Sequence, residues 1–310
     1  MLGRKYMRRE DAGNRKLKKK AEQAGNTKYP NSSLARDILG NGIETLQEDI
    51  ANLKAAENFR GSISLEVPTG DGIQGKFYDK YRICAEECPS EAINLSEPVS
   101  ESRMTVDTGK CILCGRCQDL APELFRIKSQ PVNPVRRKSE LILYAPGTNL
   151  PDSQADPGCE AVGENLRSKV NKILGRSLAV REVDTGSCNG CEVEINALNN
   201  PIYDIERFGI HFVASPRHAD VLLVTGPGSR NMEIALRRTY EATPDPKIVI
   251  AVGACACSGG IFGDTYATSG GIEKIVPVDV FIPGCPPRPQ ALLYGLLLAL
   301  DRIKSKTHKD

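Results

Sequence analysis

The sequence is poor in histidine and has no long hydrophobic run. Only three histidines occur in 310 residues, His211, His218 and His308, and their spacing matches no metal-binding motif. The longest apolar stretch, Ala291–Leu300, has about ten residues, whereas a membrane-spanning helix needs about twenty. We therefore expect neither a histidine-based metal centre nor a transmembrane segment in this chain.

Two further signals are missing. No apolar segment of a secretory signal peptide follows the basic residues Met1–Lys5. The glycine-rich stretch Gly226–Ser229 lacks the Gly-Lys-Ser/Thr of a phosphate-binding P-loop and is better interpreted as a turn into a helix. The missing signal peptide, together with an odd number of cysteines that cluster at metal-binding spacings, predicts a protein of a reducing compartment.

The charge of the chain is unevenly distributed. Residues 1–28 contain ten Lys or Arg against three acids, a net charge of +7, although the whole chain carries only +2. We interpret residues 1–60 as a basic, partly disordered tail followed by a packing helix in residues 33–59. The tail could dock on anionic lipid headgroups or on an acidic partner. Nucleic acid is not an expected partner, because no aromatic or groove-forming pattern accompanies the basic run.

Cysteine is the residue that the sequence has in abundance, with eleven copies. In the C-terminal part, predicted strands and helices alternate, which is typical of a parallel sheet covered on both faces. Four cysteines follow these predicted strands, and the carboxyl ends of parallel strands meet at one edge of an open sheet. We expect four thiols to converge there: Cys188, Cys191, Cys255 and Cys285.

A set of four thiolates without histidine suits a [4Fe-4S] cluster or a structural zinc ion. Zinc sites usually take two local pairs of ligands, whereas here the third and fourth cysteines come singly from distant loops. This spacing favours a cubane cluster, with zinc and unrelated buried thiols as the alternatives. Nearby glycines would let the backbone approach a bulky inorganic core: Gly253, Gly259, Gly260 and Gly284.

Residues 76–127 contain a second cysteine pattern. In two-cluster bacterial ferredoxins the run C-x2-C-x2-C-x3-C-P occurs twice, and the fourth cysteine of each run binds the other cluster. Both runs are present here, each incomplete. The first keeps Cys84 and Cys88-Pro89, and the second keeps Cys111, Cys114 and Cys117. Tyr78 and Tyr81 occupy the missing positions of the first run, and Ala121-Pro122 those of the second.

The crossing of ligands between the two runs explains which cysteines survive. Cys88, Cys111, Cys114 and Cys117 together make one full ligand set. The segment therefore resembles a ferredoxin that has kept one [4Fe-4S] cluster and lost its twin. On this interpretation Cys84 is a buried free thiol. The isolated Cys159 is expected to be structural or free.

The C-terminal half resembles a known family in the stretches VDTGSCNGCEVEI, SPRHADVLLVTG, VGACACSGGIF and VFIPGCPPRPQALLYGLLLAL. It is similar to the small electron-transfer subunit of membrane-bound group 4 [NiFe] hydrogenases of the formate hydrogenlyase type, a relative of the complex I 20 kDa subunit. The resemblance covers residues 178–304. Complex I subunits carry adjacent cysteines at the first motif, whereas this chain has Cys-Asn-Gly-Cys, the hydrogenase form.

This resemblance implies roles for individual residues. The proximal cluster would be bound by the four C-terminal cysteines already named, with Cys255 preferred over Cys257. Glu194 matches an acidic residue on a redox-coupled proton path, although an acid in the first turn of a helix is also favoured by the helix dipole. No complete catalytic site is expected in this chain alone, which would act as one subunit of an oxidoreductase.

The expected fold is α/β, a flavodoxin-like parallel-sheet domain in residues 178–310. A small α+β ferredoxin-like domain in residues 61–135 and a linker in residues 136–177 precede it. The expected function is electron transfer through two [4Fe-4S] clusters, between a donor subunit and the [NiFe] centre of a partner large subunit. The alternatives are a quinone-reducing complex I subunit and a zinc-stabilised binding protein. Other electron-transfer and membrane subunits would hold the chain peripherally at the cytoplasmic face of the cell membrane.

The crossed ligand assignment predicts different outcomes for two neighbouring cysteines. Cys88→Ser should destroy or convert the N-terminal cluster, since it removes one of four thiolates, whereas Cys84→Ser should leave the cluster in place. Electron paramagnetic resonance of the reduced protein measures the effect. Equal damage from the two substitutions would indicate instead that Cys84 and Cys88 act as a local pair.

Overall fold

The structure is a computed structural model that describes residues 59–66, 76–95, 104–130, 132–144 and 158–307. All of these belong to one structural unit, residues 50–310. The basic tail and most of the helix expected in residues 33–59 lie outside the described residues, as do residues 67–75, 96–103 and 131 of the ferredoxin-like part.

The C-terminal part is built on a five-stranded parallel sheet with the strand order β10-β9-β8-β6-β7. In chain order this corresponds to 2-1-3-4-5, the doubly wound order of flavodoxin-like domains. The predicted fold class is confirmed. The strands are β6 (Leu178–Asp184), β7 (Ile210–Phe212), β8 (Val221–Thr225), β9 (Ile248–Val252) and β10 (Val280–Ile282).

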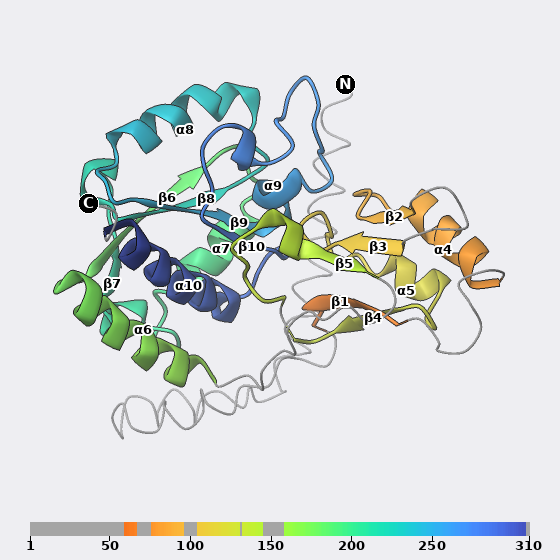
Figure 1. Cartoon of the computed structure of the whole chain (residues 1–310), viewed down its shortest axis with the longest axis horizontal. Coiled ribbons are helices and arrows are strands. Elements are labelled where there is room, and N and C mark those ends of the chain that lie inside the picture. Colours follow the sequence, from red (N-terminus) through yellow and green to blue (C-terminus); the bar gives the residue numbers. More distant parts are fainter. Residues whose placement is uncertain (1–58, 67–75, 96–103, 131, 145–157, 308–310) are drawn as a thin grey trace, which may run out of the picture. The chain divides into compact units, whose positions relative to one another are not determined.

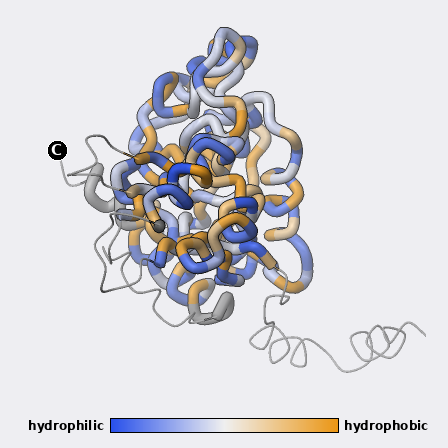
Figure 2. The backbone as a smooth tube through the Cα atoms, turned by 90° about the vertical axis from the view of Figure 1, so that its right-hand side faces the viewer, coloured by the Kyte–Doolittle hydropathy of each residue, from blue (hydrophilic) through white to orange (hydrophobic). Residues whose placement is uncertain are grey.

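Helices cover both faces of this sheet, with α8 on one side and α6 and α10 on the other (Figure 1). The colour in Figure 2 changes repeatedly between hydrophilic and hydrophobic along the helical turns, as expected for helices with one buried face. The helices are α6 (Gly158–Leu174), α7 (Gly190–Ala197), α8 (Arg230–Ala242), α9 (Gly253–Ser258) and α10 (Pro289–Thr307). Short 3-10 turns, η3 (Ile205–Phe208), η4 (Pro216–His218) and η5 (Ile272–Lys274), complete the domain.

The central strands have no polar face, because each supplies two separate cores. Successive side chains of a strand point to opposite faces. In β8, Val221 and Leu223 enter the core beneath α6 and α10, while Leu222 and Val224 enter the core beneath α8. β9 alternates in the same way. This double burial explains why these strands appear in the sequence as continuous apolar runs.

The apolar stretch Ala291–Leu300 lies in α10 and is largely buried within the domain. Leu292, Leu296 and Leu300 are fully buried against the sheet, as its length predicted. Among the described residues, no helix has both the length and the apolarity needed to cross a membrane.

The ferredoxin-like part contains two small antiparallel sheets, one of β1 and β4 and one of β2, β3 and β5. Its mixture of short strands and helices is the α+β organisation that the cysteine pattern suggested. The elements are β1 (Ser62–Leu65), α4 (Lys76–Glu86), β2 (Ile93–Leu95), β3 (Met104–Asp107), α5 (Arg116–Leu120), β4 (Phe125–Lys128), η2 (Lys138–Leu141) and β5 (Ile142–Tyr144).

Three residues from incomplete ligand positions lie in the core of this part. Tyr81, Cys84 and Ala121 are all buried in one hydrophobic cluster. The Tyr81 ring stacks on Phe125 with 5.6 Å between centroids. Its hydroxyl donates a hydrogen bond of 2.8 Å to the carbonyl of Thr105. Side chains therefore pack where the sequence pattern has lost a second ligand set.

The segment between the two parts is structured where it is described. Residues 136–177 were assigned to a linker, but β5 pairs with β3 and α6 packs against α10. Val135 exchanges two backbone hydrogen bonds with Phe281, of 2.9 and 2.8 Å, and so joins the segment to β10. The proposed domain boundaries remain a prediction.

Helix α6 is expected to be part of the C-terminal core and not a spacer. Leu166 is fully buried in the core beneath α6 and α10, whereas its neighbour Arg167 is exposed. Leu166→Ala should lower the free energy of unfolding by about 2–5 kcal/mol. Arg167→Ala should change it by less than about 0.5 kcal/mol. Chemical denaturation followed by circular dichroism measures both, and equal effects would contradict the packing.

Candidate metal centres

The loop that carries Cys188 is shaped by hydrogen bonds at the end of β6. A carboxylate oxygen of Asp184 accepts from the backbone N–H groups of Gly186 at 2.8 Å and Ser187 at 2.7 Å. The Ser187 hydroxyl then accepts from the N–H of Asn189 at 3.1 Å. Asn189 adopts a left-handed conformation with φ 67° and leads directly into α7. The turn therefore exposes Cys188 at the carboxyl end of a central strand.

The other three C-terminal cysteines reach the same edge of the sheet from three elements. Cys191 lies in the first turn of α7, where the sequence placed it in a loop. Cys255 lies in the short helix α9 that follows β9, a helix that the sequence did not predict. Cys285 follows β10, and the backbone N–H of Ala254 donates to the carbonyl of Gly284 at 2.8 Å. That bond joins the last two cysteine loops.

The electrostatics of these thiols reflect their proximity. Burial raises the pKa of Cys191, and the nearby charges of Glu192, Cys255, Cys285 and Cys188 raise it further. Burial, followed by Cys285 and Cys188, raises the pKa of Cys255 to about 11. Metal binding would therefore have to release the protons of these thiols, as metal-thiolate formation requires. The structure brings together the four cysteines that the sequence pattern predicts to converge.

Two glycines let the backbone approach the sulfur atoms closely. A Cβ added to Gly253, which has φ +85°, would lie 2.6 Å from the Sγ of Cys191. One added to Gly260, which has φ +52°, would lie 3.1 Å from the Sγ of Cys255. The chemistry of four thiols suits an iron–sulfur cluster or a zinc ion. Among the described residues, no group of three or more His, Cys, Asp or Glu side chains is arranged to hold a metal ion.

The neighbouring thiol of Cys257 points away from this edge. Cys257 is fully buried among the apolar residues beneath α8, and its Sγ lies 3.7 Å from the carbonyl oxygen of Ala251. This position supports the choice of Cys255 as the ligand from VGACACSGG.

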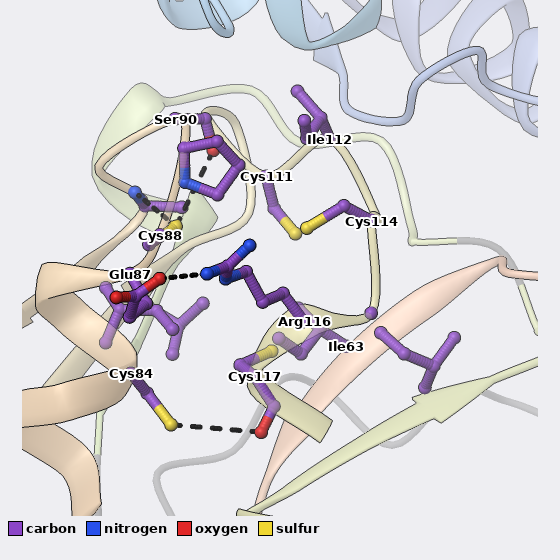
Figure 3. A pocket seen from close by; sticks show the side chains of 16 residues that line it. Ile63, Cys84, Glu87, Cys88, Ser90, Cys111, Ile112, Cys114, Arg116 and Cys117 are labelled. Atoms are coloured by element: carbon purple, nitrogen blue, oxygen red, sulfur yellow. Dashed lines mark hydrogen bonds and ion pairs between the residues drawn. The ribbon is translucent and has the colours of Figure 1, made fainter. Parts of the chain in front are cut away.

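A second group of cysteines surrounds a small cavity of about 20 Å³ in the ferredoxin-like part. Cys88 follows α4, Cys111 and Cys114 lie on the loop after β3, and Cys117 lies in α5. Figure 3 shows the side chains of these four residues around one space, with Cys111 and Cys114 side by side. Cys84 also lines the cavity. Its thiol is directed at the carbonyl oxygen of Cys117, at 3.8 Å (Figure 3).

Backbone hydrogen bonds distinguish two of the expected ligands. The N–H of Ala92 donates to the Sγ of Cys88 at 3.4 Å, and the N–H of Leu113 donates to the Sγ of Cys111 at 3.4 Å. Such bonds stabilise the negative charge of a cluster-binding thiolate. They support Cys88 as the ligand contributed by the first run, with Cys84 directed at a carbonyl instead.

Burial governs the protonation of this group too. It raises the pKa of Cys111 and of Cys117 to about 12, and that of Cys84 to about 11. An ion pair between Glu87 and Arg116 lies across the cavity (Figure 3). Cys114 is exposed, so this site has one edge at the surface.

An acidic pair near the C-terminal cysteines, Glu182 and Glu192, was not predicted from the sequence. Both carboxylate oxygens of Glu192 are buried and have no hydrogen-bond partner among the described residues. Burial raises the pKa of Glu182 on β6, and the charge of Glu192 raises it further. The alternation of β6 could have identified Glu182 as an acid inside a buried strand. Burial raises the pKa of Glu194, while the charge of Arg288 lowers it. Its proposed place on a proton path remains a prediction.

The chain is similar in sequence to subunits of membrane-bound oxidoreductases. Residues 188–299 match the sequence profile of the family described as NADH ubiquinone oxidoreductase, 20 Kd subunit. A probable membrane-bound hydrogenase subunit mbhJ of Pyrococcus furiosus is 54% identical over 45% of this chain and 84% of its own length. Formate hydrogenlyase subunit 7 of Escherichia coli is 53% identical over 46% of this chain and 56% of its own length.

Subunits of quinone-reducing complexes show comparable similarity. An NADH-quinone oxidoreductase subunit of Citrifermentans bemidjiense is 51% identical over 37% of this chain and 68% of its own length. These matches, of 116 to 144 residues, are each much shorter than the chain.

The close approach of Gly253 to the Cys191 thiol can be tested by substituting two glycines with alanine. Gly253→Ala should strongly reduce the iron bound by the C-terminal cysteines, because the new methyl group would displace the Cys191 thiol. Gly175 also has a positive φ of +63°, but nothing lies within 4 Å of its added Cβ. Gly175→Ala should therefore cost about 1–2 kcal/mol of backbone strain and keep its iron. Equal iron content in the two purified variants would contradict the assignment.

Proposed function

The chain belongs to the family of the 20 kDa subunit of NADH ubiquinone oxidoreductase, and from this membership we propose that it is the iron–sulfur electron-transfer subunit of a [NiFe] hydrogenase-type complex. The observation that carries the proposal is the convergence of four thiols from the segments that follow β6, β9 and β10. We propose Cys188, Cys191, Cys255 and Cys285 as the ligands of one [4Fe-4S] cluster. Such a cluster, when bound, supplies reversible one-electron transfer.

The four cysteines of this site differ in their exposure to solvent. Cys191 and Cys255 are partly buried beside the sheet, while Cys188 and Cys285 are exposed. Electron exchange with a partner would take place at this exposed edge, because the rate of transfer falls steeply with distance. The partner expected there is the large subunit that carries the [NiFe] centre, at which H2 is formed or oxidised.

We further propose that Cys88, Cys111, Cys114 and Cys117 hold a second [4Fe-4S] cluster. The backbone N–H groups that point at Cys88 and Cys111 support this proposal, as does the exposed edge at Cys114. An internal ferredoxin-like site would let one chain receive electrons from a donor subunit and deliver them to the large subunit. It would replace a ferredoxin subunit that usually occurs as a separate chain.

The hydrogenase assignment depends on the spacing of the first motif. Asn189 and Gly190 separate Cys188 from Cys191, and Asn189 forms the left-handed entry to α7. The complex I subunits that the chain resembles carry adjacent cysteines at this motif and therefore lack these two intervening residues. The second candidate function is electron delivery to quinone, which the comparable similarity to an NADH-quinone oxidoreductase subunit keeps open. Nickel in the complex purified with this chain favours the first function, and its absence together with quinone reduction favours the second.

The partners would also determine where the chain works. The related subunits include one from a membrane-bound hydrogenase. We propose that this chain is a peripheral subunit at the cytoplasmic face of the cell membrane, attached through partner subunits. The basic tail of residues 1–28 could add an electrostatic contact with anionic headgroups or an acidic subunit.

Metal analysis separates the electron-transfer function from a zinc-stabilised binding protein. We expect about eight iron and about eight acid-labile sulfide per purified chain, four of each for every cubane. The quadruple substitution of Cys111, Cys114, Cys117 and Cys88 by serine should halve both values and serves as the control. Stoichiometric zinc in place of iron would contradict the proposed function.

A further inference from the structure

Two consecutive residues, Phe59 and Arg60, contact both cysteine-bearing regions of the chain. They precede β1 and belong to neither ligand set. Arg60 contacts the loop that carries Cys114, and Phe59 contacts Arg288, three residues after Cys285. The segment therefore spans the two proposed cluster sites by direct side-chain contacts.

The side chain of Arg60 binds backbone carbonyl groups of the loop that carries Cys114. One guanidinium nitrogen donates to the carbonyl oxygens of Leu113, at 3.5 Å, and Cys114. The loop accommodates the guanidinium because the next residue, Gly115, has no side chain, and an added Cβ would lie 3.2 Å from the Cζ of Arg60. Leu113 itself adopts a left-handed conformation with φ 55°, so this loop has a backbone shape that depends on its neighbours.

Phe59 holds the C-terminal loop through a cation–π contact. The Cζ of Arg288 lies 4.4 Å from the centroid of the Phe59 ring, within the distance at which a guanidinium is attracted to an aromatic face. Arg288 follows the sequence Cys285-Pro286-Pro287, and Pro287 packs close to Gly253 and Gly284. A group that fixes Arg288 therefore restrains the loop that carries Cys285.

We propose that Phe59 and Arg60 form a positioning segment that links the two cluster loops and tunes the N-terminal cluster. The inference rests on the proposed function, since it concerns the order and potential of its two sites. Phe59, through its neighbour Arg60, ties the loop after β10 to the loop after β3. Arg60 places a positive charge against the Cys114 carbonyl, beside the site where added electrons would be held.

This charge has a defined effect on the cluster potential. A reduced cluster is more negative than an oxidised one, so a neighbouring cation stabilises the reduced form and raises the midpoint potential. Because Arg60 is exposed, salt weakens the effect. Arg116 contributes less, because the carboxylate of Glu87 pairs with it.

The first test is a redox titration of the full-length chain followed by electron paramagnetic resonance. Arg60→Gln should lower the midpoint potential of the N-terminal cluster, with a larger shift at low ionic strength, and leave the C-terminal cluster unchanged. Arg60→Lys should keep most of the wild-type potential, because it keeps the charge. Arg126→Gln is the control, since Arg126 pairs with Glu66 on the same part of the chain and does not line the cavity.

The second test uses hydrogen–deuterium exchange and does not depend on cluster redox chemistry. Phe59→Leu keeps the charge of the chain but removes the ring. It should raise amide exchange about two- to fivefold in both residues 111–117 and residues 285–290, the change expected for losing one exposed cation–π contact. Arg126→Gln should change neither region.

The two tests separate failure of this inference from failure of the proposed function. Wild-type protein without iron and sulfide would contradict the proposed function, while the exchange experiment would still report on the link. If both clusters are present, an Arg60→Gln shift no larger than that of Arg126→Gln would overturn the tuning role. Exchange that stays at the wild-type rate in both loops of Phe59→Leu, or rises in one loop only, would overturn the link.

Discussion

The parallel pairing of β6, β8, β9 and β10 is the constraint on which the C-terminal domain depends. Strands that run in one direction place all their following loops at one edge, so thiols separated by about a hundred residues of sequence meet there. The same pairing buries both faces of β8 and β9, in which Thr225 at the end of β8 is the single polar side chain. Chemistry is therefore confined to the loops at this edge.

At both cysteine groups, the burial of thiols opposes their deprotonation and so opposes metal binding. Burial raises the pKa of Cys191, Cys111 and Cys117, so these cysteines hold their protons until a metal replaces them. For the proposed clusters to form, the free energy of iron binding would have to exceed this cost. Backbone N–H groups directed at Cys88 and Cys111 offset part of it. They do so without bringing a second titrating group into the cavity.

Much of the C-terminal domain could be predicted from sequence because its elements have strong local signals. The apolar run Val221–Thr225 coincides with β8, and the helix that the sequence predicts over residues 231–243 is α8, Arg230–Ala242. Helix α9 was missed because six residues of glycine, alanine, cysteine and serine have no helical periodicity. The contacts of Arg60 were missed for a different reason, since a hydrogen bond across 54 residues leaves no local pattern.

The core of the ferredoxin-like part has a consequence for biogenesis. In this part, Tyr81, Cys84 and Ala121 pack with Phe125 and Leu124, where the sequence pattern has lost a ligand set. That half is held by dispersion and the hydrophobic effect and needs no inorganic component. A newly synthesised chain would therefore be expected to form this core without iron. Because Cys88, Cys111 and Cys117 pack against the same core, the proposed cluster would be added to a part of the chain that is already folded.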